Sequence, residues 1–194
     1  MNNIFLVNGS TRKKGFNAQL MQKIADIFSE CNVSVRELHW QDIPVFCQDN
    51  DYPPPPEVER VRRDVVSSMA LFFVTPEYNG YCPGGLKNLL DWLSRSMNPA
   101  NSRGESFIHN RITAVTSAAA GGGVAVRHNM EQLLGFVRTQ VVNEYSCGVA
   151  IKKDDWKSGE LTITDDEAAG LRRFVLSFLQ AVKEREELKL NPMI

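Results

Sequence analysis

Short apolar stretches alternate along the chain with longer stretches in which apolar residues recur every three or four positions. The short stretches are typical of strands, and those that are apolar throughout are typical of strands buried in a parallel sheet. Five strands are expected, at 3–8 (NIFLVN), 33–38 (VSVREL), 70–75 (ALFFVT), 112–117 (ITAVTS) and 140–146 (QVVNEYS).

The longer stretches predict five helices, because their apolar residues form a stripe along one helical face. Four stripes are Leu20, Ile24, Ile27 and Phe28; Val58, Val61, Val65 and Met69; Leu86, Leu89, Leu90 and Leu93; and Val126, Met130, Leu133, Leu134 and Val137. The last stripe is Leu171, Phe174, Val175, Phe178, Leu179 and Val182. Thr164 and Glu167 fit a capping box at the start of this last helix.

Strands that alternate with helices predict an α/β fold, in which helices cover both faces of a parallel sheet. A length of 194 residues suits one domain spanning 1–194, since a second core would be cramped. In such sheets a ligand binds beyond the carboxyl ends of the strands, near the point where the strand order reverses. Three loops that join a strand to a helix are therefore candidates for a site: 9–17, 76–84 and 117–123.

The charge and hydropathy of the chain narrow the classes of partner. The formal net charge is -1, so no strong field attracts nucleic acid or an anionic membrane. No apolar run approaches the roughly 20 residues of a membrane-spanning helix, and the N-terminus lacks the basic start of a signal peptide. We expect a cytoplasmic protein that binds neither nucleic acid nor membrane.

Cysteine and histidine are too scattered to predict a disulfide framework or a metal site. No two cysteines are spaced as C-x-x-C, and the histidines lack the spacing of metal ligands. The residues concerned are Cys31, Cys47, Cys82, Cys147, His39, His109 and His128. We expect reduced thiols and no metal centre.

The first candidate loop combines groups that suit a phosphate. Ser10 and Thr11 offer hydroxyls, Arg12 offers a guanidinium, and the helix start offers free backbone N–H groups. The alternative is a capped helix with a basic, solvated connector, because Ser, Thr and Asn are ordinary capping residues. The loop matches neither G-x-G-x-x-G nor the G-K-[ST] ending of a P-loop, so a single phosphate fits better than a dinucleotide or a nucleoside triphosphate.

The second and third loops suit a planar ring. Tyr78 can offer a flat surface and Asn79 a hydrogen-bonding group to a heteroaromatic ligand. The alternative is that the prolines and glycines of 76–84 only punctuate a turn, with Tyr78 packing locally. The small residues of SAAAGGG (117–123) either let a ligand approach the backbone closely or form a flexible start to a helix.

Two stretches together resemble the NADPH-dependent FMN reductase family of flavodoxin-like proteins, and in particular its quinone, chromate and azo-dye reductase members. They are GSTRKKGFN (9–17) and PEYNGYCPGGLKNLLDWLSR (76–95), and the similarity extends to SGELTITDDE (158–167). The resemblance implies a flavodoxin-like three-layer fold with strand order 2-1-3-4-5. It also implies bound FMN, NAD(P)H as co-substrate with NADPH favoured, and a homodimer or homotetramer.

The resemblance further implies a set of cofactor-binding residues. Ser10, Arg12 and Asn17 would hold the FMN phosphate, with Gly15 and Phe16 in the same stretch. The isoalloxazine would be lined by Pro76, Glu77, Tyr78, Asn79 and Gly80, and Ser117 would border the third loop. Relatives often carry a serine where this chain has Gly15, which leaves one hydroxyl fewer for the phosphate.

The implied chemistry belongs to the flavin, and no side chain is expected to act as a catalytic acid, base or nucleophile. NAD(P)H would stack on the exposed isoalloxazine face and pass hydride to N5, and an oxidised acceptor would then take the same face. This predicts ping-pong kinetics with quinones, azo compounds, chromate or free flavin as acceptors. Cys82 adjoins the second loop, where a small buried residue is the simpler interpretation than a redox group.

Two other classes of protein share such a fold. One is a flavodoxin-type electron carrier, which binds FMN without substrate turnover of its own. Carriers of this kind usually have strongly acidic surfaces, which a net charge of -1 disfavours. The other is a sensor or binding module that uses the fold without flavin.

Overall fold

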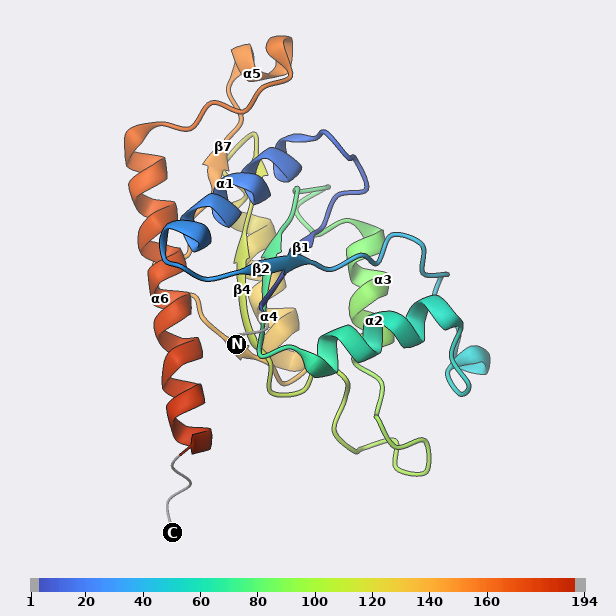
Figure 1. Cartoon of the computed structure of the whole chain (residues 1–194). Helices are drawn as coiled ribbons and strands as arrows, with labels where there is room; N and C mark the ends of the chain where they lie inside the picture. Colours follow the sequence, from blue (N-terminus) through green and yellow to red (C-terminus); the bar gives the residue numbers. More distant parts are fainter. Residues whose placement is uncertain (1–3, 191–194) are drawn as a thin grey trace.

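A five-stranded parallel sheet forms the centre of the computed structural model, which describes residues 4–190 (Figure 1). In spatial order its strands are β2 (Val35–Glu37), β1 (Ile4–Asn8), β3 (Ala70–Val74), β4 (Ile112–Thr116) and β6 (Gln140–Val141). All neighbouring pairs in this sheet are parallel. Because β6 is the fifth strand of the sheet, the predicted order 2-1-3-4-5 is confirmed.

The register of the strands aligns the ends from which the candidate loops leave. Asn8 pairs with Val74, and Val74 pairs with Thr116. The ladder continues one step further, because the N–H of Gly9 donates to the Val74 carbonyl at 2.8 Å and that of Thr75 to the Thr116 carbonyl at 3.0 Å. The three loops therefore begin at the same level on one edge of the sheet.

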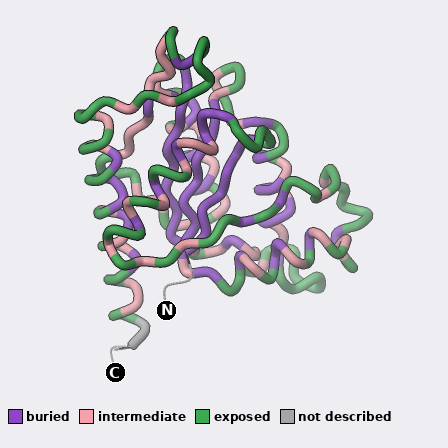
Figure 2. Tube along the Cα trace, turned by 45° about the horizontal axis from the view of Figure 1, so that its top comes forward, coloured by how far each residue is buried: buried purple, intermediate pink, exposed green. Residues whose placement is uncertain are grey.

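Helices cover both faces of the sheet, as the alternation predicts. They are α1 (Phe16–Glu30), α2 (Pro56–Ser67), α3 (Gly84–Leu93), α4 (Val124–Phe136), α5 (Lys153–Ser158) and α6 (Asp165–Leu190), with a short 3-10 turn η1 (Gln48–Asn50). Alternate strand residues face opposite ways, so Ile4 and Leu6 pack against α1 and α6, whereas Phe5 and Val7 pack against α2, α3 and α4. Figure 2 shows the resulting buried layer along the strands.

The expected strands differ from the observed ones mainly at the fifth. A strand over 140–146 was predicted, but β6 ends at Val141, because residues 143–146 form a turn in which the N–H of Ser146 donates to the Asn143 carbonyl at 2.9 Å. The chain then forms β7 (Val149–Ala150), which pairs with β5 (Ala118–Ala119) in a separate two-stranded sheet. The first expected strand included Asn3, which lies outside the described residues. None of the helices within residues 4–190 is long and apolar enough to cross a membrane.

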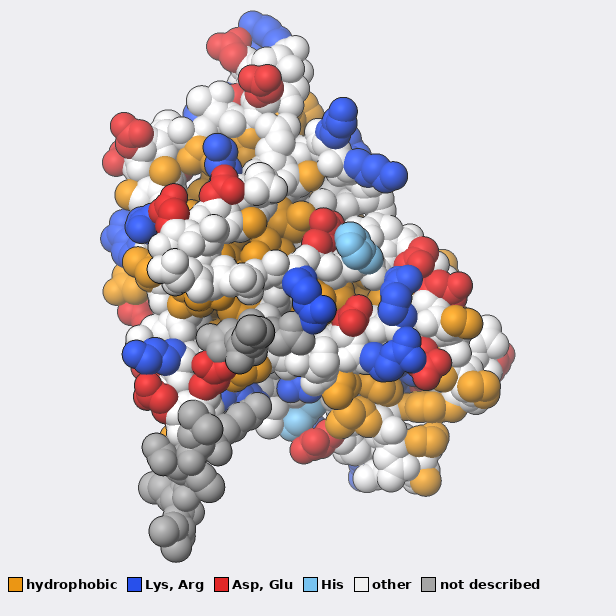
Figure 3. Space-filling view, in the orientation of Figure 1, with side chains coloured by type: hydrophobic (Ala, Val, Ile, Leu, Met, Phe, Trp, Pro, Cys, Tyr) orange, Lys and Arg blue, Asp and Glu red, His pale blue; other side chains and the backbone are white. Residues whose placement is uncertain are grey.

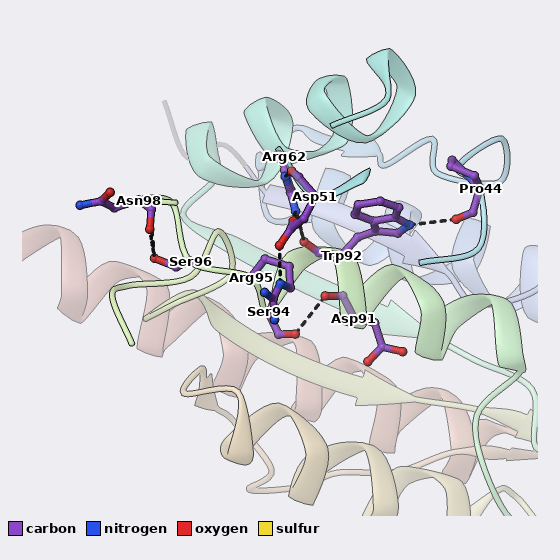
Figure 4. A network of polar contacts seen from close by, with 9 residues as sticks. All are labelled: Pro44, Asp51, Arg62, Asp91, Trp92, Ser94, Arg95, Ser96 and Asn98. Atoms are coloured by element: carbon purple, nitrogen blue, oxygen red, sulfur yellow. Dashed lines mark hydrogen bonds and ion pairs between the residues drawn. The ribbon is translucent and has the colours of Figure 1, made fainter. Parts of the chain in front are cut away.

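A buried ion pair attaches the proline-rich loop to the helices beside it (Figure 4). Arg62 of α2 donates to the Asp51 carboxylate at 2.7 Å and to the backbone carbonyl of Trp92 in α3 at 3.1 Å. Arg95 donates to the other Asp51 oxygen at 2.6 Å. The side chains of Arg62 and Asp51 are 3% and 4% exposed, so the pair is shielded from water. It holds α2, α3 and the 44–55 loop together.

Candidate functional site

A cleft of about 230 Å³ opens at the carboxyl ends of β1, β3 and β4. Eight of the predicted cofactor-binding residues line it: Ser10, Arg12, Gly15, Phe16, Asn17, Pro76, Glu77 and Tyr78. Six further residues complete its walls: Ala118, Ala119, Ala120, Gly121, Ile151 and Trp156. The tertiary structure thus brings all three candidate loops to one cleft.

The first loop folds tightly at its start and ends in exposed basic side chains. The Asn8 carboxamide oxygen accepts from the N–H of Ser10 at 3.0 Å, and the Ser10 hydroxyl accepts from the N–H of Arg12 at 3.1 Å. A Cβ at Gly9 would lie 2.7 Å from the Thr75 hydroxyl, so only glycine fits between the first and second loops. Arg12 and the two lysines after it are exposed, and Figure 3 shows basic side chains over this part of the surface.

The start of α1 at Gly15 has the features of an anion site. Gly15 is the N-cap residue, has φ -81° and ψ 169°, and supplies no side-chain cap. The first backbone N–H groups of a helix have no partner within the helix, and the helix dipole favours negative charge beside them. The first turn of α1 contains no acidic residue. Within residues 4–190, the Arg12 guanidinium makes no hydrogen bond or ion pair that would hold it away from this point.

Asn17 connects the first loop to the third rather than projecting freely into the cleft. Its side-chain amide donates to the Ala118 carbonyl at 3.0 Å and its oxygen accepts from the Ala118 N–H at 2.9 Å. Asn17 is 4% exposed. Its carboxamide therefore satisfies both backbone groups of Ala118 and fixes the distance between two walls of the cleft.

The second loop contains a two-residue turn between Tyr78 and Tyr81. Tyr78 and Tyr81 exchange two backbone hydrogen bonds, at 2.8 and 3.0 Å. Between them Asn79 and Gly80 have φ of 55° and 80°, the left-handed pair that a type I′ turn requires. Asn79 and Gly80 therefore occupy the tip of the turn and do not line the cleft, whereas Tyr78, half exposed, does.

Glu77 and Ser117 join the second and third loops to α4. The Glu77 carboxylate accepts from the N–H of Val126 at 3.2 Å, in the first turn of α4, where the helix dipole favours a negative charge. Ser117 is fully buried beneath Gly123, and its hydroxyl has no hydrogen-bond partner among residues 4–190. Gly123 has φ 67° and no space for a Cβ. Ser117 thus supports the third loop from below and does not line the cleft.

Cys82 follows the turn and lies outside the cleft walls. It is partly buried, and burial raises the pKa of its thiol. A raised pKa disfavours the reactive thiolate, which agrees with the interpretation of Cys82 as a small packing residue. Within the described part of the chain, the cleft walls contain no cysteine, histidine or lysine.

Two residues of the cleft walls, Ile151 and Trp156, come from the segment after β7 and were not predicted from the sequence. Trp156 lies on α5, which begins after Lys152 and ends at Gly159, where φ is 76°. A glycine one residue after a short polar stretch is a recognisable helix stop, so KKDDWKSG carried a local signal for this helix. Nothing in that local signal indicated that the helix lies beside the cleft.

Known proteins are similar in sequence to this chain over most of its length. The sequence model of the family described as NADPH-dependent FMN reductase matches residues 2–154. A protein of Pseudomonas putida named quinone reductase is 32% identical over 186 residues, which cover 93% of this chain and 94% of the relative. A 2-hydroxy-1,4-benzoquinone reductase of a Burkholderia species is 27% identical over 184 residues, covering 94% and 97%.

A solved structure is similar in fold. The flavoenzyme NAD(P)H:(acceptor) oxidoreductase FerB from Paracoccus denitrificans superposes with a TM-score of 0.80 at 24% sequence identity, covering 95% of this chain and 98% of that chain.

Proposed function

The chain belongs to the NADPH-dependent FMN reductase family, and from this premise we propose that its cleft binds FMN in one orientation. The phosphate lies at the start of α1, beside Arg12 and Gly15, and the isoalloxazine lies against Pro76, Glu77 and Tyr78. One observation supports this orientation. The start of α1, which favours an anion, and the aromatic ring of Tyr78 line the same cleft.

The family match and the relatives establish the activity as that of an FMN-dependent NAD(P)H oxidoreductase. We propose quinones as the acceptors, since two of the relatives described above are named for quinone reduction. Azo compounds, chromate and free flavin remain candidates of the same kind, because an open ring face selects acceptors weakly. NADPH is proposed as the favoured donor.

The residues present fit the phosphate group of FMN. The Arg12 guanidinium has no partner in the described part of the chain, and charge-assisted hydrogen bonds to phosphate are shorter and stronger than neutral ones. The orphan N–H groups of α1 point toward the same end of the cleft. Ser10 is 6% exposed and its hydroxyl accepts from the Arg12 N–H, which shapes the loop around this point.

The residues present also fit a planar ring. Pro76 is buried, Tyr78 is half exposed and both line the cleft, so an apolar side chain and an aromatic one can lie against the ring. When bound, FMN supplies the hydride chemistry, and the protein supplies binding and orientation. Here the type I′ turn holds Tyr78 in place, Glu77 is held by α4, and the open side of the cleft leaves room for donor and acceptor in turn.

We also propose a domain organisation, a compartment and an oligomeric state for the whole molecule. Residues 1–194 form one FMN-binding domain, which is supported by the two core clusters sharing a single sheet. The protein acts in the cytoplasm as a homodimer or homotetramer. The four cysteines are free thiols, and a reducing compartment keeps thiols in that form.

Steady-state kinetics test the proposal. NADPH is varied at several fixed concentrations of a benzoquinone, and parallel double-reciprocal lines are expected, because donor and acceptor share one open face. Intersecting lines from a ternary complex would contradict the shared face. A protein that binds FMN but oxidises no NADPH with any quinone would instead be an electron carrier.

Titration with FMN and with riboflavin tests the orientation separately. The two ligands differ only in the phosphate, so FMN is expected to bind at least tenfold more tightly, a difference of about 1.4 kcal/mol. Equal affinities would remove the phosphate site from the proposal while leaving the activity in place.

A further inference from the structure

Trp156 places a large aromatic ring at the end of the cleft formed by the first loop. Its ring lies edge-on to Phe16, with centroids 5.1 Å apart and planes at 88°. Phe16 is the first residue of α1, directly after Gly15. This edge-to-face arrangement is a favourable one for aromatic pairs. Trp156 therefore belongs to the end of the cleft where Arg12 and the helix start lie.

The exposure of Trp156 sets it apart from the other tryptophans. Trp40 and Trp92 are 2% and 1% exposed and belong to the packed interior, whereas Trp156 is 58% exposed and lines the cleft. Among the described residues, its ring pairs with that of Phe16. Much of the ring is thus available to a ligand in the cleft.

The segment that carries Trp156 is held in place by a buried carboxylate. Asp155 accepts from the N–H of Lys152 at 2.8 Å and from that of Thr162 at 3.1 Å, which closes the segment on itself. Hydrogen bonds from the Thr162 side chain and these backbone groups hold the pKa of Asp155 below its usual value. Asp155 therefore stays ionised, and keeps these bonds, at neutral pH.

The same segment is attached to α1. The Gln19 side chain donates to the Gly159 carbonyl at 2.8 Å and accepts from the N–H of Leu161 at 2.8 Å. Gln19 lies one turn after the start of the helix that carries Phe16. Trp156 is thus positioned relative to the phosphate end of the cleft before any ligand binds, which reduces the entropy lost on binding.

We propose that Trp156 contacts bound FMN at its phosphate end and excludes water there, which strengthens the interaction of the phosphate with Arg12. The inference rests on the proposed orientation of FMN. Charge interactions strengthen as water is removed, because the effective dielectric constant falls. Trp156 lies just beyond the region that the family model matches, which ends at residue 154.

Affinity measurements on the apoprotein test the contact. Trp156→Ala is expected to weaken FMN about three- to tenfold, as the loss of one aromatic contact implies. Riboflavin affinity is expected to change less than twofold. Phe136→Ala is the matched control, because Phe136 is 85% exposed and lies outside the cleft, and it should leave both affinities unchanged. Thermal unfolding of each apoprotein checks that the fold is intact.

Two variants that differ by one charge test whether Trp156 lies at the phosphate end, even if the alanine variant folds poorly. Trp156→Glu and Trp156→Gln have the same shape and differ by one negative charge. If Trp156 lies at the phosphate end, the glutamate variant should bind FMN about fivefold or more weakly than the glutamine variant, through like-charge repulsion. The two should bind riboflavin equally.

The outcomes separate this inference from the proposed function. Unchanged FMN affinity in folded Trp156→Ala would overturn the contact, and equal FMN affinity of the glutamate and glutamine variants would overturn its location. Failure of the proposed orientation appears instead in the unaltered protein, as equal binding of FMN and riboflavin.

Discussion

The carboxamide of Asn17 hydrogen-bonds both backbone groups of Ala118, although the two residues are 101 positions apart in the sequence. The pair joins the start of α1 to β5, and thereby joins the first and third walls of the cleft. Because the contact is buried, neither backbone group of Ala118 has water as a ready substitute. The Asn17 side chain therefore helps to set the width of the cleft.

Asn17→Ala is expected to destabilise the protein and to weaken FMN and riboflavin to the same extent. Leaving a buried polar group unsatisfied costs about 1–3 kcal/mol, and the loosened wall affects the ring as much as the phosphate. Chemical denaturation and titration with both ligands measure the two effects. Asn17→Asp is a second variant to compare, because its added negative charge should weaken the binding of FMN more than that of riboflavin.

Arg12→Ala is expected to weaken FMN roughly ten- to a hundredfold, because a charge-assisted hydrogen bond contributes about 1.5–3 kcal/mol. Riboflavin binding should barely change, since Arg12 is exposed and has no partner in the described fold to lose. Calorimetry on Arg12→Ala, with Lys13→Ala as a neighbouring control, measures the difference. Equal losses for FMN and riboflavin would mean that Arg12 supports the fold and not the phosphate.

Gly15→Ser is expected to tighten FMN about two- to fivefold and to raise the stability of α1 by a few tenths of a kcal/mol, the typical gain of a serine over a glycine at the N-cap. The backbone permits it, because Gly15 has φ -81° and not a left-handed value. The new Cβ would lie 3.2 Å from the Cβ of Arg12, so Arg12 must shift by a few tenths of an ångström. Weaker FMN binding in calorimetry would show that this shift displaces the guanidinium from the phosphate.

Arg62→Met is expected to lower the free energy of unfolding by about 3 kcal/mol, the lower end of the range for a broken buried ion pair, because the buried Asp51 carboxylate loses Arg62 but keeps Arg95. Arg60→Met is the matched control on the same helix. Arg60 pairs with Asp42 in an exposed ion pair, with side chains 39% and 53% exposed, so its loss should cost about 1 kcal/mol or less. Urea unfolding of both variants measures the two losses in free energy of unfolding. Similar losses would show that the buried ion pair stabilises the fold no more than the exposed one.

Light scattering is expected to show a homodimer or homotetramer, with a mass two or four times that of the 21.8 kDa chain. Exposed apolar side chains that suit an interface include Val45, Tyr52 and Met97, from the loop that contains η1 and the loop after α3. Figure 3 shows hydrophobic side chains gathered over this lower right part of the molecule. A monomer at micromolar concentration would contradict the prediction.

The sequence by itself determined the layers of the fold. Stretches such as ALFFVT, which becomes β3, and the stripe Leu86, Leu89, Leu90 and Leu93, which becomes one face of α3, show where apolar side chains are buried. That signal is local, because the periodicity of a strand or a helix can be read within a few residues. The same reasoning identified three loops at one edge of the sheet, and the aligned register of β1, β3 and β4 brings them there.

The tertiary structure alone decided what each loop residue does. The Asn17 side chain hydrogen-bonds the backbone of Ala118. Asn79 and Gly80 form the tip of a turn, and Ser117 is buried under Gly123. Trp156 lies at the cleft because Asp155 closes its segment on itself and Gln19 attaches that segment to α1. These roles depend on contacts between residues far apart in the chain, whereas a residue's type and its local spacing specify its own helix or strand and not its distant partner.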